Sequence, residues 1–433
     1  MRLTIGGLSL AALMALVGSL EAKGTVDWRT SIPITRARAW ADSRPFDVQL
    51  TSFMAARNIP GAALAVTRRG RLVLANGYGY ANARARRPVA PDALFRIASV
   101  SKPVTAAAVL RLAELHPDRM TLDTPVMSLL QVRPHLTGGA KADARLAQIT
   151  VRMLLQHTAG WDRDKSGDPM FQPLEIAAAL GMRAPPGPRD VVRYMLAREL
   201  DFDPGTRYAY SNFGYCVLGR LIEDVTGQAY ERFVQDQLLG PWGITRMRLG
   251  RTLASGRRRG EVTYYDPGEG RNVMVPGDET PAPQPYGCWH LEAMDAHGGW
   301  IASAPDLVRF ASAFDHPKHC PVLAPESIET MFACPPGAAG HEADGSPKAA
   351  YYGCGWMVRP TADGRANTWH GGSLPGTHTL LVRRHDGLNW AALFSQRADE
   401  TGLGYDEIDS ALHGAADAIE DWPSWNLFDQ GDP

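Results

Sequence analysis

The 433-residue sequence has almost no net charge, because its 45 basic side chains are matched by 46 acidic ones and the formal net charge is -1. The marked basic excess of nucleic-acid-binding domains is absent, so the composition gives no reason to expect a nucleic-acid partner. Hydrophobic residues make up 45% and charged residues 21% of the chain. This composition excludes a disordered polypeptide and indicates a globular protein with a large core.

Motifs for metals are also lacking. There is no His-Glu-x-x-His and no Cys-x-x-Cys in the chain. The short cluster of His316, His319 and Cys320 is of a kind that arises by chance. We therefore expect neither a metal nor a cofactor.

Cysteine is scarce, with five in the chain. Because five is odd, at least one thiol stays unpaired within a monomer. We expect that thiol to be Cys216, which lies in an apolar stretch with helical spacing. Spacing alone does not set disulfide connectivity, and we consider Cys320–Cys334 and Cys288–Cys354 as bridges.

One long apolar run is present, at the N-terminus. Residues 3–20 are uncharged and mostly apolar; Arg2 precedes them, and small residues such as Ala22 and Gly24 follow. This order is typical of a secretory signal peptide, which we expect over residues 1–22. A membrane anchor is the alternative. After signal removal no membrane span would remain, so we expect a periplasmic or secreted protein.

Strand signals occur near both ends of the chain. Two apolar runs, 61–67 and 72–80, flank a Gly-bearing turn and predict a hairpin. The runs 377–384 and 389–395 flank Asp386-Gly387, a strong turn signal, and predict a second hairpin.

Helical periodicity dominates the rest of the chain. It predicts helices over 48–56, 101–115, 213–225 and 405–419. Gly227 is well placed to end the third of these.

These elements predict an α+β fold, with an antiparallel sheet flanked by helices and an inserted helical domain. The sheet domain would combine residues 45–115 and 290–420. The inserted, mostly helical domain would span 116–289. We expect the loops at 162–190 and 255–290 to shape the substrate pocket.

Ser99 and Lys102 stand three residues apart where a helix is predicted to begin, so both side chains fall on one face. A serine hydroxyl is a weak nucleophile until a base removes its proton, and an unprotonated lysine one turn away would do so. A free lysine titrates near about 10.4, so this role needs a pKa lower by about three units, roughly 4 kcal/mol. Burial and the positive end of a helix both act in that direction. The alternative is an ordinary helical turn with a solvated lysine.

Two later segments offer groups that complement this pair. Tyr210 and Asn212 precede an apolar helix; a phenol would share a proton with Lys102, and an amide would orient a substrate carbonyl. The alternative is that Tyr210 packs and Asn212 caps the helix. His370 and Gly372 lead into the second hairpin, where glycine lets a ligand approach the backbone and an amide would stabilise an oxyanion. The alternative there is a plain bend at a strand edge.

Taken in order, the three segments resemble the serine β-lactamase and penicillin-binding-protein superfamily, in its class C-like branch, which includes carboxylesterases such as those of family VIII, D-amino-acid peptidases and lactamase-like proteins. That branch has a Ser-x-x-Lys, a Tyr-x-Asn and a Lys-Thr-Gly or His-x-Gly motif. Here these are Ser99–Lys102, Tyr210–Asn212 and His370–Gly372. The resemblance covers about residues 45–415. Supporting stretches lie at 154–161, 298–310 and 352–356.

The resemblance implies a β-lactamase-like fold and a serine hydrolase that forms an acyl-enzyme. Ser99 would be the acylated nucleophile, and Lys102 and Tyr210 would share the general-base work. Asn212 would bind the carbonyl of the substrate. The expected partner is a small-molecule ester, peptide or β-lactam, and the expected type is a carboxylesterase, a D-amino-acid peptidase or a weak β-lactamase.

The third motif would contribute to substrate binding through His370, Gly372 and Ser373. The resemblance places the oxyanion hole at the backbone amides of Ser99 and Ser373. His370 stands where true class C lactamases carry lysine. That difference removes a fixed positive charge, so neutral esters or peptides fit better than penicillins.

Other interpretations remain open. A Ser-His-Asp esterase would need a Gly-x-Ser-x-Gly elbow, which is absent, although Asp295 and His297 would supply an acid and a base. The stretch 77–82 lacks the third glycine of a dinucleotide-binding loop and is predicted to be strand. A protein of a different class, catalytically silent, would use the same cleft to hold cell-wall peptide or a β-lactam.

Overall fold

The computed structural model describes residues 32–275, 277, 279–398 and 401–430. The expected signal peptide at 1–22 lies outside these residues. No helix in the described part is long and apolar enough to cross a membrane.

Strands from both ends of the chain form one antiparallel sheet, as predicted. Its order is β1-β3-β2-β14-β13-β12-β11-β10, with β4 paired to β3. The chain therefore closes the sheet by pairing β2, from its first part, with β14, from its last. The strands of this sheet are β1 (Ile34–Arg36), β2 (Gly61–Arg68), β3 (Arg71–Asn82), β4 (Arg87–Pro88), β10 (Tyr351–Tyr352), β11 (Met357–Pro360), β12 (Ala366–Leu374), β13 (Thr377–Arg383) and β14 (Leu388–Phe394).

Two smaller sheets lie outside it. One has the order β5-β9-β6, and the other pairs β7 with β8. The first leads directly into the turn that carries Ser99. These strands are β5 (Phe95–Arg96), β6 (Arg248–Leu249), β7 (Glu269–Gly270), β8 (Ala282–Pro283) and β9 (Trp300–Ala302).

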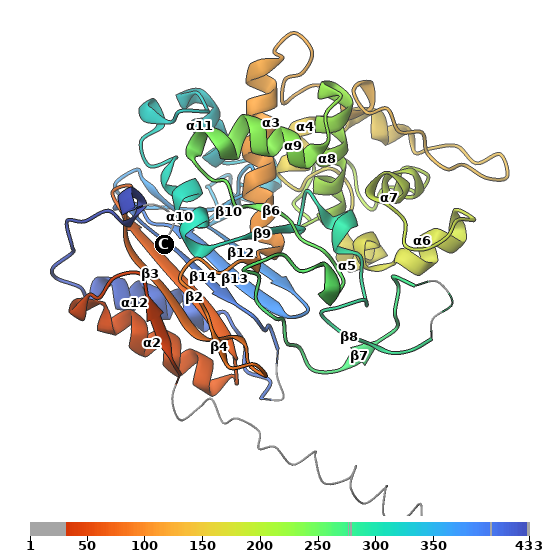
Figure 1. The fold of residues 1–433 in the computed structure, drawn as a ribbon. Helices are drawn as coiled ribbons and strands as arrows, with labels where there is room; N and C mark the ends of the chain where they lie inside the picture. Colours follow the sequence, from red (N-terminus) through yellow and green to blue (C-terminus); the bar gives the residue numbers. More distant parts are fainter. Residues whose placement is uncertain (1–31, 276, 278, 399–400, 431–433) are drawn as a thin grey trace, which may run out of the picture.

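The main sheet is covered on both faces, which explains why its central strands are apolar without alternation. Successive side chains of a strand point to opposite faces. Leu64 thus packs in one core with α2 and α12, whereas Ala63 packs in the other with α10 and α3. Figure 1 shows α2 beside α12 on one face and α10 on the other. The helices are α2 (Arg44–Ala56), α3 (Ser101–Leu115), α4 (Val151–Leu155), α5 (Arg163–Ser166), α6 (Pro173–Ala179), α7 (Pro188–Met195), α8 (Asn212–Thr226), α9 (Tyr230–Val234), α10 (Ala304–Ser312), α11 (Pro325–Phe332) and α12 (Glu407–Asp417).

Helix α3 is the central helix of the molecule (Figure 1). Its first ten residues, 101–110, are all buried. A helix that is buried on every side must be apolar or small on every side, and its run of alanines meets that need. The single lysine in this stretch, Lys102, is therefore enclosed by the fold.

Most of the predicted elements are confirmed, including both hairpins, the helix over 101–115 and the end of α8 at Gly227, which has φ of 72°. Both disulfides considered from the sequence are wrong. All five cysteines are free thiols, and Cys216 is buried as expected. The boundaries of the inserted domain at 116 and 289 stay a prediction, although α4 to α9 all fall between them.

Candidate active site

Ser99 lies on a single 3-10 turn, Ala98–Val100, that joins the small sheet to α3. The sequence analysis placed Ser99 where a helix begins, and α3 itself starts at Ser101. Ala98, before Ser99, has φ of 46°, in the left-handed region that a residue with a side chain rarely adopts. Such local strain is typical of functional turns. The turn leaves the side chain of Ser99 partly exposed, at the N-terminal end of α3.

Lys102 is fully buried directly beneath this turn, and its amine meets three oxygens. Nζ lies 3.1 Å from Ser99 Oγ, and it donates to Asn212 Oδ1 at 2.7 Å and to the carbonyl oxygen of His297 at 3.1 Å. The last two oxygens can only accept hydrogen bonds. A neutral amine has two N–H groups for them and one lone pair left, which faces the hydroxyl of Ser99.

The surroundings of Lys102 favour that neutral amine. Burial lowers the pKa of Lys102 well below its ordinary value, and the nearby Arg163 guanidinium lowers it further, whereas the Asp168 carboxylate acts to raise it. Burial dominates because desolvation penalises the charged form. The amine that the sequence required as a base is thus prepared by the fold.

Tyr210 closes the other side of the site. Its ring lies 4.7 Å from Lys102 Nζ and 4.4 Å from the ring of His157. Burial raises the pKa of Tyr210 well above its ordinary value, although contact with the hydroxyl of Ser99 and the charge of Arg163 both act against this. The phenol therefore stays protonated, which makes it a proton donor and leaves the base work to Lys102.

Asn212 occupies the first turn of α8, and Ser211 caps this helix by accepting a hydrogen bond of 3.1 Å from Gly214 N. The side chain of Asn212 is therefore available to the site and does not serve as the cap. Its Nδ2 donates to Asp168 Oδ2 at 2.6 Å, while its Oδ1 accepts from Lys102. Asp168 thus holds the amide in the orientation that presents oxygen to the amine.

His370 on β12 has both ring nitrogens engaged. Nδ1 lies 2.6 Å from the carbonyl oxygen of Gly371, and Nε2 lies 2.9 Å from the hydroxyl of Tyr352. A carbonyl oxygen only accepts, so Nδ1 carries the proton and Nε2 accepts from Tyr352. Burial lowers the pKa of His370 to about 3, so the ring is neutral near pH 7. The third motif brings no fixed charge to the site.

Gly372, also on β12, is required by its neighbours. A Cβ at this position would approach the carbonyl oxygen of Ile97 to 2.4 Å and Thr379 Oγ1 to 2.3 Å. The close approach that sequence reasoning assigned to a ligand is thus made by the segment leading to Ser99. Ser373 follows with an exposed side chain, opposite His378 on β13.

These residues line one cavity of about 430 Å³. Ser99, Tyr210, Asn212, His370, Gly372 and Ser373 all contribute to it, while Lys102 lies beneath its wall. Phe171 adds an apolar wall, and the charged side chains that line the cavity are Arg163, Arg397 and Asp406. Every residue predicted for the site is therefore in or directly behind this cavity.

Four residues at the site were given no role by sequence reasoning. Asp168 and Arg163 come from a segment without a recognisable motif. His157 and Tyr352 stand in stretches that supported the resemblance, and the ring of His157 lies 4.5 Å from that of Tyr352. The φ of 58° at His157 is a further sign of a constrained turn.

The Ser-His-Asp interpretation finds no support in the geometry. Asp295 forms a buried ion pair of 2.6 Å with Arg220, and no hydrogen bond or ion pair joins it to a histidine in the described part of the chain. His297 faces the site through its backbone carbonyl, which accepts from Lys102.

Comparison with known proteins identifies the same superfamily. The family model Beta-lactamase matches residues 46–414. The octameric penicillin-binding protein homologue of Pyrococcus abyssi shares the fold, with a TM-score of 0.64 and 22% identity over 90% of this chain and 78% of that chain.

Three curated relatives differ in what their names state. The probable fimbrial assembly protein FimD, serogroup H1, of Dichelobacter nodosus is 30% identical over 58% of this chain and 57% of its own length. Esterase EstB of Burkholderia gladioli is 30% identical over 77% and 85%, respectively. The D-aminopeptidase of Gluconobacter oxydans is 28% identical over 75% and 53%. The chain thus spans little more than half the length of two of these relatives.

Proposed function

The chain belongs to the β-lactamase family and is a serine hydrolase; from this premise we propose that it hydrolyses neutral carboxylic esters through an acyl-enzyme on Ser99. The observation that carries the proposal is the 3.1 Å contact between Ser99 Oγ and a fully buried lysine amine whose other two partners are both acceptors. The similarity to esterase EstB, which covers most of both chains, supports the choice of an ester.

In the acylation step, Ser99 Oγ attacks the ester carbonyl carbon while its proton passes to the lone pair of Lys102. The oxygen of the carbonyl becomes an oxyanion, for which the N–H groups of Ser99 and Ser373 are the proposed donors. The C–O bond to the alcohol then breaks. The alkoxide leaves with a proton from Tyr210, which recovers one from Lys102, so Ser99 ends as an ester and Lys102 is again neutral.

In the deacylation step, water takes the place of the alcohol. The amine of Lys102, through the hydroxyl of Tyr210, accepts a proton from the water as its oxygen attacks the acyl carbon. The bond to Ser99 Oγ breaks, and Ser99 regains its proton from Lys102. The carboxylic acid is released, and the free enzyme is restored.

The neutral state of His370 favours uncharged substrates near the third motif. Phe171, whose side chain is well exposed in the cavity, offers an apolar surface for an acyl or alcohol group. An apolar substrate group that packs on Phe171 buries apolar surface, and this contributes binding energy without requiring a charge on the substrate.

The test is turnover of a short-chain p-nitrophenyl ester by the wild type, Ser99→Ala and Ser101→Ala, with labelling by a fluorophosphonate followed by peptide mapping. We expect hydrolysis and labelling at Ser99 in the wild type and Ser101→Ala, and neither in Ser99→Ala. Ser101 is the matched control, because its hydroxyl accepts a 3.4 Å hydrogen bond from Trp300 N inside the core. Binding of a labelled penicillin or cell-wall peptide without any acylation or turnover would instead support the silent binding protein.

We propose in addition that the protein is exported. The proposal is supported by the sequence of residues 1–24, where Arg2 precedes an apolar run and small residues follow it. N-terminal sequencing of the protein from its native cells would find a start near residue 23 if export with cleavage occurs. A start at residue 1 or 2 in the membrane fraction would favour the anchor, and the same start in the cytosolic fraction would contradict export.

A further inference from the structure

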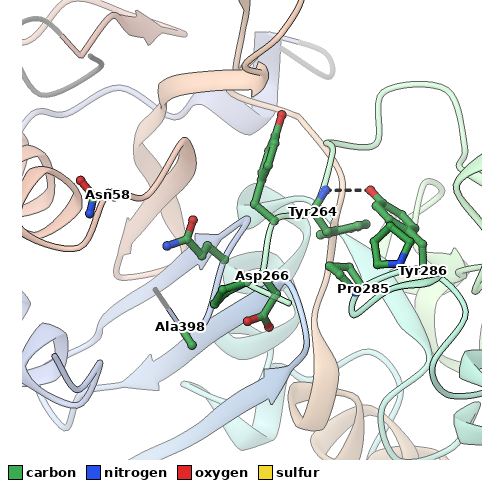
Figure 2. Close-up of a pocket in the computed structure, with 10 residues that line it drawn as sticks. Asn58, Tyr264, Asp266, Pro285, Tyr286 and Ala398 are labelled. Carbon is green, nitrogen blue, oxygen red and sulfur yellow. Dashed lines mark hydrogen bonds between the residues drawn. The ribbon is translucent and has the colours of Figure 1, made fainter. Parts of the chain in front are cut away.

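A second cavity, of about 530 Å³, lies where the segment 263–266 runs beside the end of β14 (Figure 2). The two segments are joined by a hydrogen bond of 2.8 Å from Tyr265 N to the carbonyl oxygen of Ser395. The walls are mainly aromatic and proline side chains, among them Tyr264, Tyr265, Pro285 and Tyr286.

This cavity shares a wall with the candidate active site. Arg397 lines the active-site cavity, whereas its neighbours Gln396 and Ala398 line the second one. Arg397 Nε donates to Asp266 Oδ2 at 3.2 Å, and Asp266 lines the second cavity. The ion pair therefore stands between the two spaces. Figure 2 shows Asp266 between Ala398 and Pro285.

Asp266 also links the wall between the two cavities to the turn that follows β12, the strand that carries His370. Its Oδ2 accepts a hydrogen bond of 2.7 Å from Gly376 N, in the turn between β12 and β13. Only 6% of its side chain is exposed. Within the described residues no hydrogen bond uses Oδ1, which leaves this carboxylate oxygen available to a ligand at the edge of an aromatic cavity.

We propose that this second cavity is a binding subsite for the distal end of the substrate, and that it takes a flat, mainly apolar group carrying an N–H or O–H donor. The proposal rests on the proposed function, since it assigns a place to the part of the ester farthest from Ser99. Cavities of this kind, with apolar walls and few polar groups, are the usual form of a small-molecule site.

The lining determines the chemistry of the group. Tyrosine and proline faces contact planar rings closely, and aromatic pairs add stabilisation beyond the area that they bury. Asp266 Oδ1 is able to accept a hydrogen bond from a donor on the ligand, because no hydrogen bond between described residues uses it. The charge of Asp266 is already balanced by Arg397, so a neutral donor such as a phenol or an amide N–H satisfies it without adding a second cation beside the guanidinium.

Direct binding tests the subsite apart from catalysis. The probes are 3-(4-hydroxyphenyl)-N,N-dimethylpropanamide and its 4-methoxy counterpart, whose tertiary amide has no N–H, so the phenol is the one donor that differs. Their binding to the full chain is followed by ligand-detected NMR. We expect the hydroxyl probe to bind wild type and Ser99→Ala equally, and the methoxy probe to bind several-fold more weakly. Ala398→Trp, which fills the cavity, is expected to weaken binding about tenfold or more.

Two further variants keep the test decisive. Ala140→Trp places the same ring on an exposed loop away from both cavities and should bind like the wild type. Tyr265→Leu removes one aromatic face and should weaken binding if Ala398→Trp does not fold, as judged by thermal unfolding. Equal binding of both probes to the wild type and Ala398→Trp, or no binding to the wild type, would overturn the subsite.

Kinetics then connects the subsite to the reaction. In a series of p-nitrophenyl esters whose acyl chain ends in a 4-hydroxyphenyl group, we expect one spacer length to give the lowest KM. For the ester with that spacer, Ala398→Trp should lower kcat/KM by about tenfold relative to its effect on the kcat/KM of the acetate ester. If the probe binds but no ester is hydrolysed, the proposed function fails and the site remains; if acetate is hydrolysed and no spacer is preferred, the substrate subsite fails.

Discussion

Lys102 Nζ donates a hydrogen bond of 2.7 Å to Asn212 Oδ1, and this contact sets the geometry of the whole site. It joins the central helix α3 to the first turn of α8, which lies more than 100 residues later in the chain. Asp168 fixes the amide from the other side at 2.6 Å. Because the amine is held by two acceptors, its remaining direction points to Ser99.

Lys102→Ala should therefore abolish most activity, with kcat for p-nitrophenyl acetate falling about a hundredfold or more.

The loss of activity in Tyr210→Phe should depend on the leaving group, since the phenol of Tyr210 is the proposed proton donor to the departing alkoxide. p-Nitrophenolate is a stable anion and needs little help, whereas an alkyl alkoxide needs a proton. We expect a clearly larger loss on an ethyl ester than on the p-nitrophenyl ester. An equal loss on both would remove Tyr210 from that role.

The pH dependence of turnover should shift in opposite directions in two charge variants. The rate rises with pH as Lys102 loses its proton, so the acid limb reports the pKa of Lys102. Arg163 lowers that pKa and Asp168 raises it. Arg163→Gln should therefore move the acid limb of kcat to higher pH, and Asp168→Asn should move it to lower pH.

Arg163→Lys is the matched control for this pair, because it keeps a positive charge near the ring of Tyr210, where the guanidinium now lies 4.6 Å away. Its acid limb should stay near that of the wild type. A limb that does not move in either charge variant, or moves in the same direction in both, would mean that another group controls the base form.

Much of this arrangement follows from local signals in the sequence. The Asp386-Gly387 turn and Gly227 mark their elements because each needs a backbone that glycine supplies, with φ of 84° and 72° at the two glycines. The ordered motifs predicted that Ser99, Lys102 and Tyr210 meet at one site, and Ser99 and Tyr210 line one cavity with Lys102 beneath its wall. The first two motifs stand at the start of helices whose type was evident from the sequence, whereas His370 and Gly372 lie within β12, a strand that the sequence analysis did not predict.

What the sequence did not predict depends on contacts between distant segments. Asp168 and Arg163 lie on loop and short-helix backbone with no motif, so nothing local marks their approach to Lys102. The two cysteine pairings failed for the same reason, because a disulfide requires a narrow range of Cα distances that spacing along the chain does not report.

Stability toward acid should reflect three buried histidines at the site. Burial lowers the pKa of His157 and of His297 well below the ordinary value and that of His370 to about 3. Below about pH 6.5 the unfolded chain takes up protons that the folded protein excludes, so the free energy of unfolding falls as pH drops toward 3. When the free energy of unfolding is measured with urea at several pH values from neutral to acidic, it should fall less in His370→Gln than in the wild type. An unchanged slope would show that His370 is protonated in the folded protein.

Strand β12 packs closely against the segment that carries Ser99. Gly372→Ala would place a Cβ 2.4 Å from the carbonyl oxygen of Ile97, so the strand or the turn must shift, and we expect a loss of stability of about 2 kcal/mol or more. Gly371→Ala is the matched control one residue away, because its Cβ would meet only the carbonyl oxygen of Thr379, at 3.8 Å. Urea denaturation checks the first effect, and ester turnover checks a second, since the shift would also displace Ser99 from Lys102. Equal stability and turnover in the two alanine variants would mean that the backbone at Ile97 shifts with no loss of stability, and that β12 does not hold the nucleophile in place.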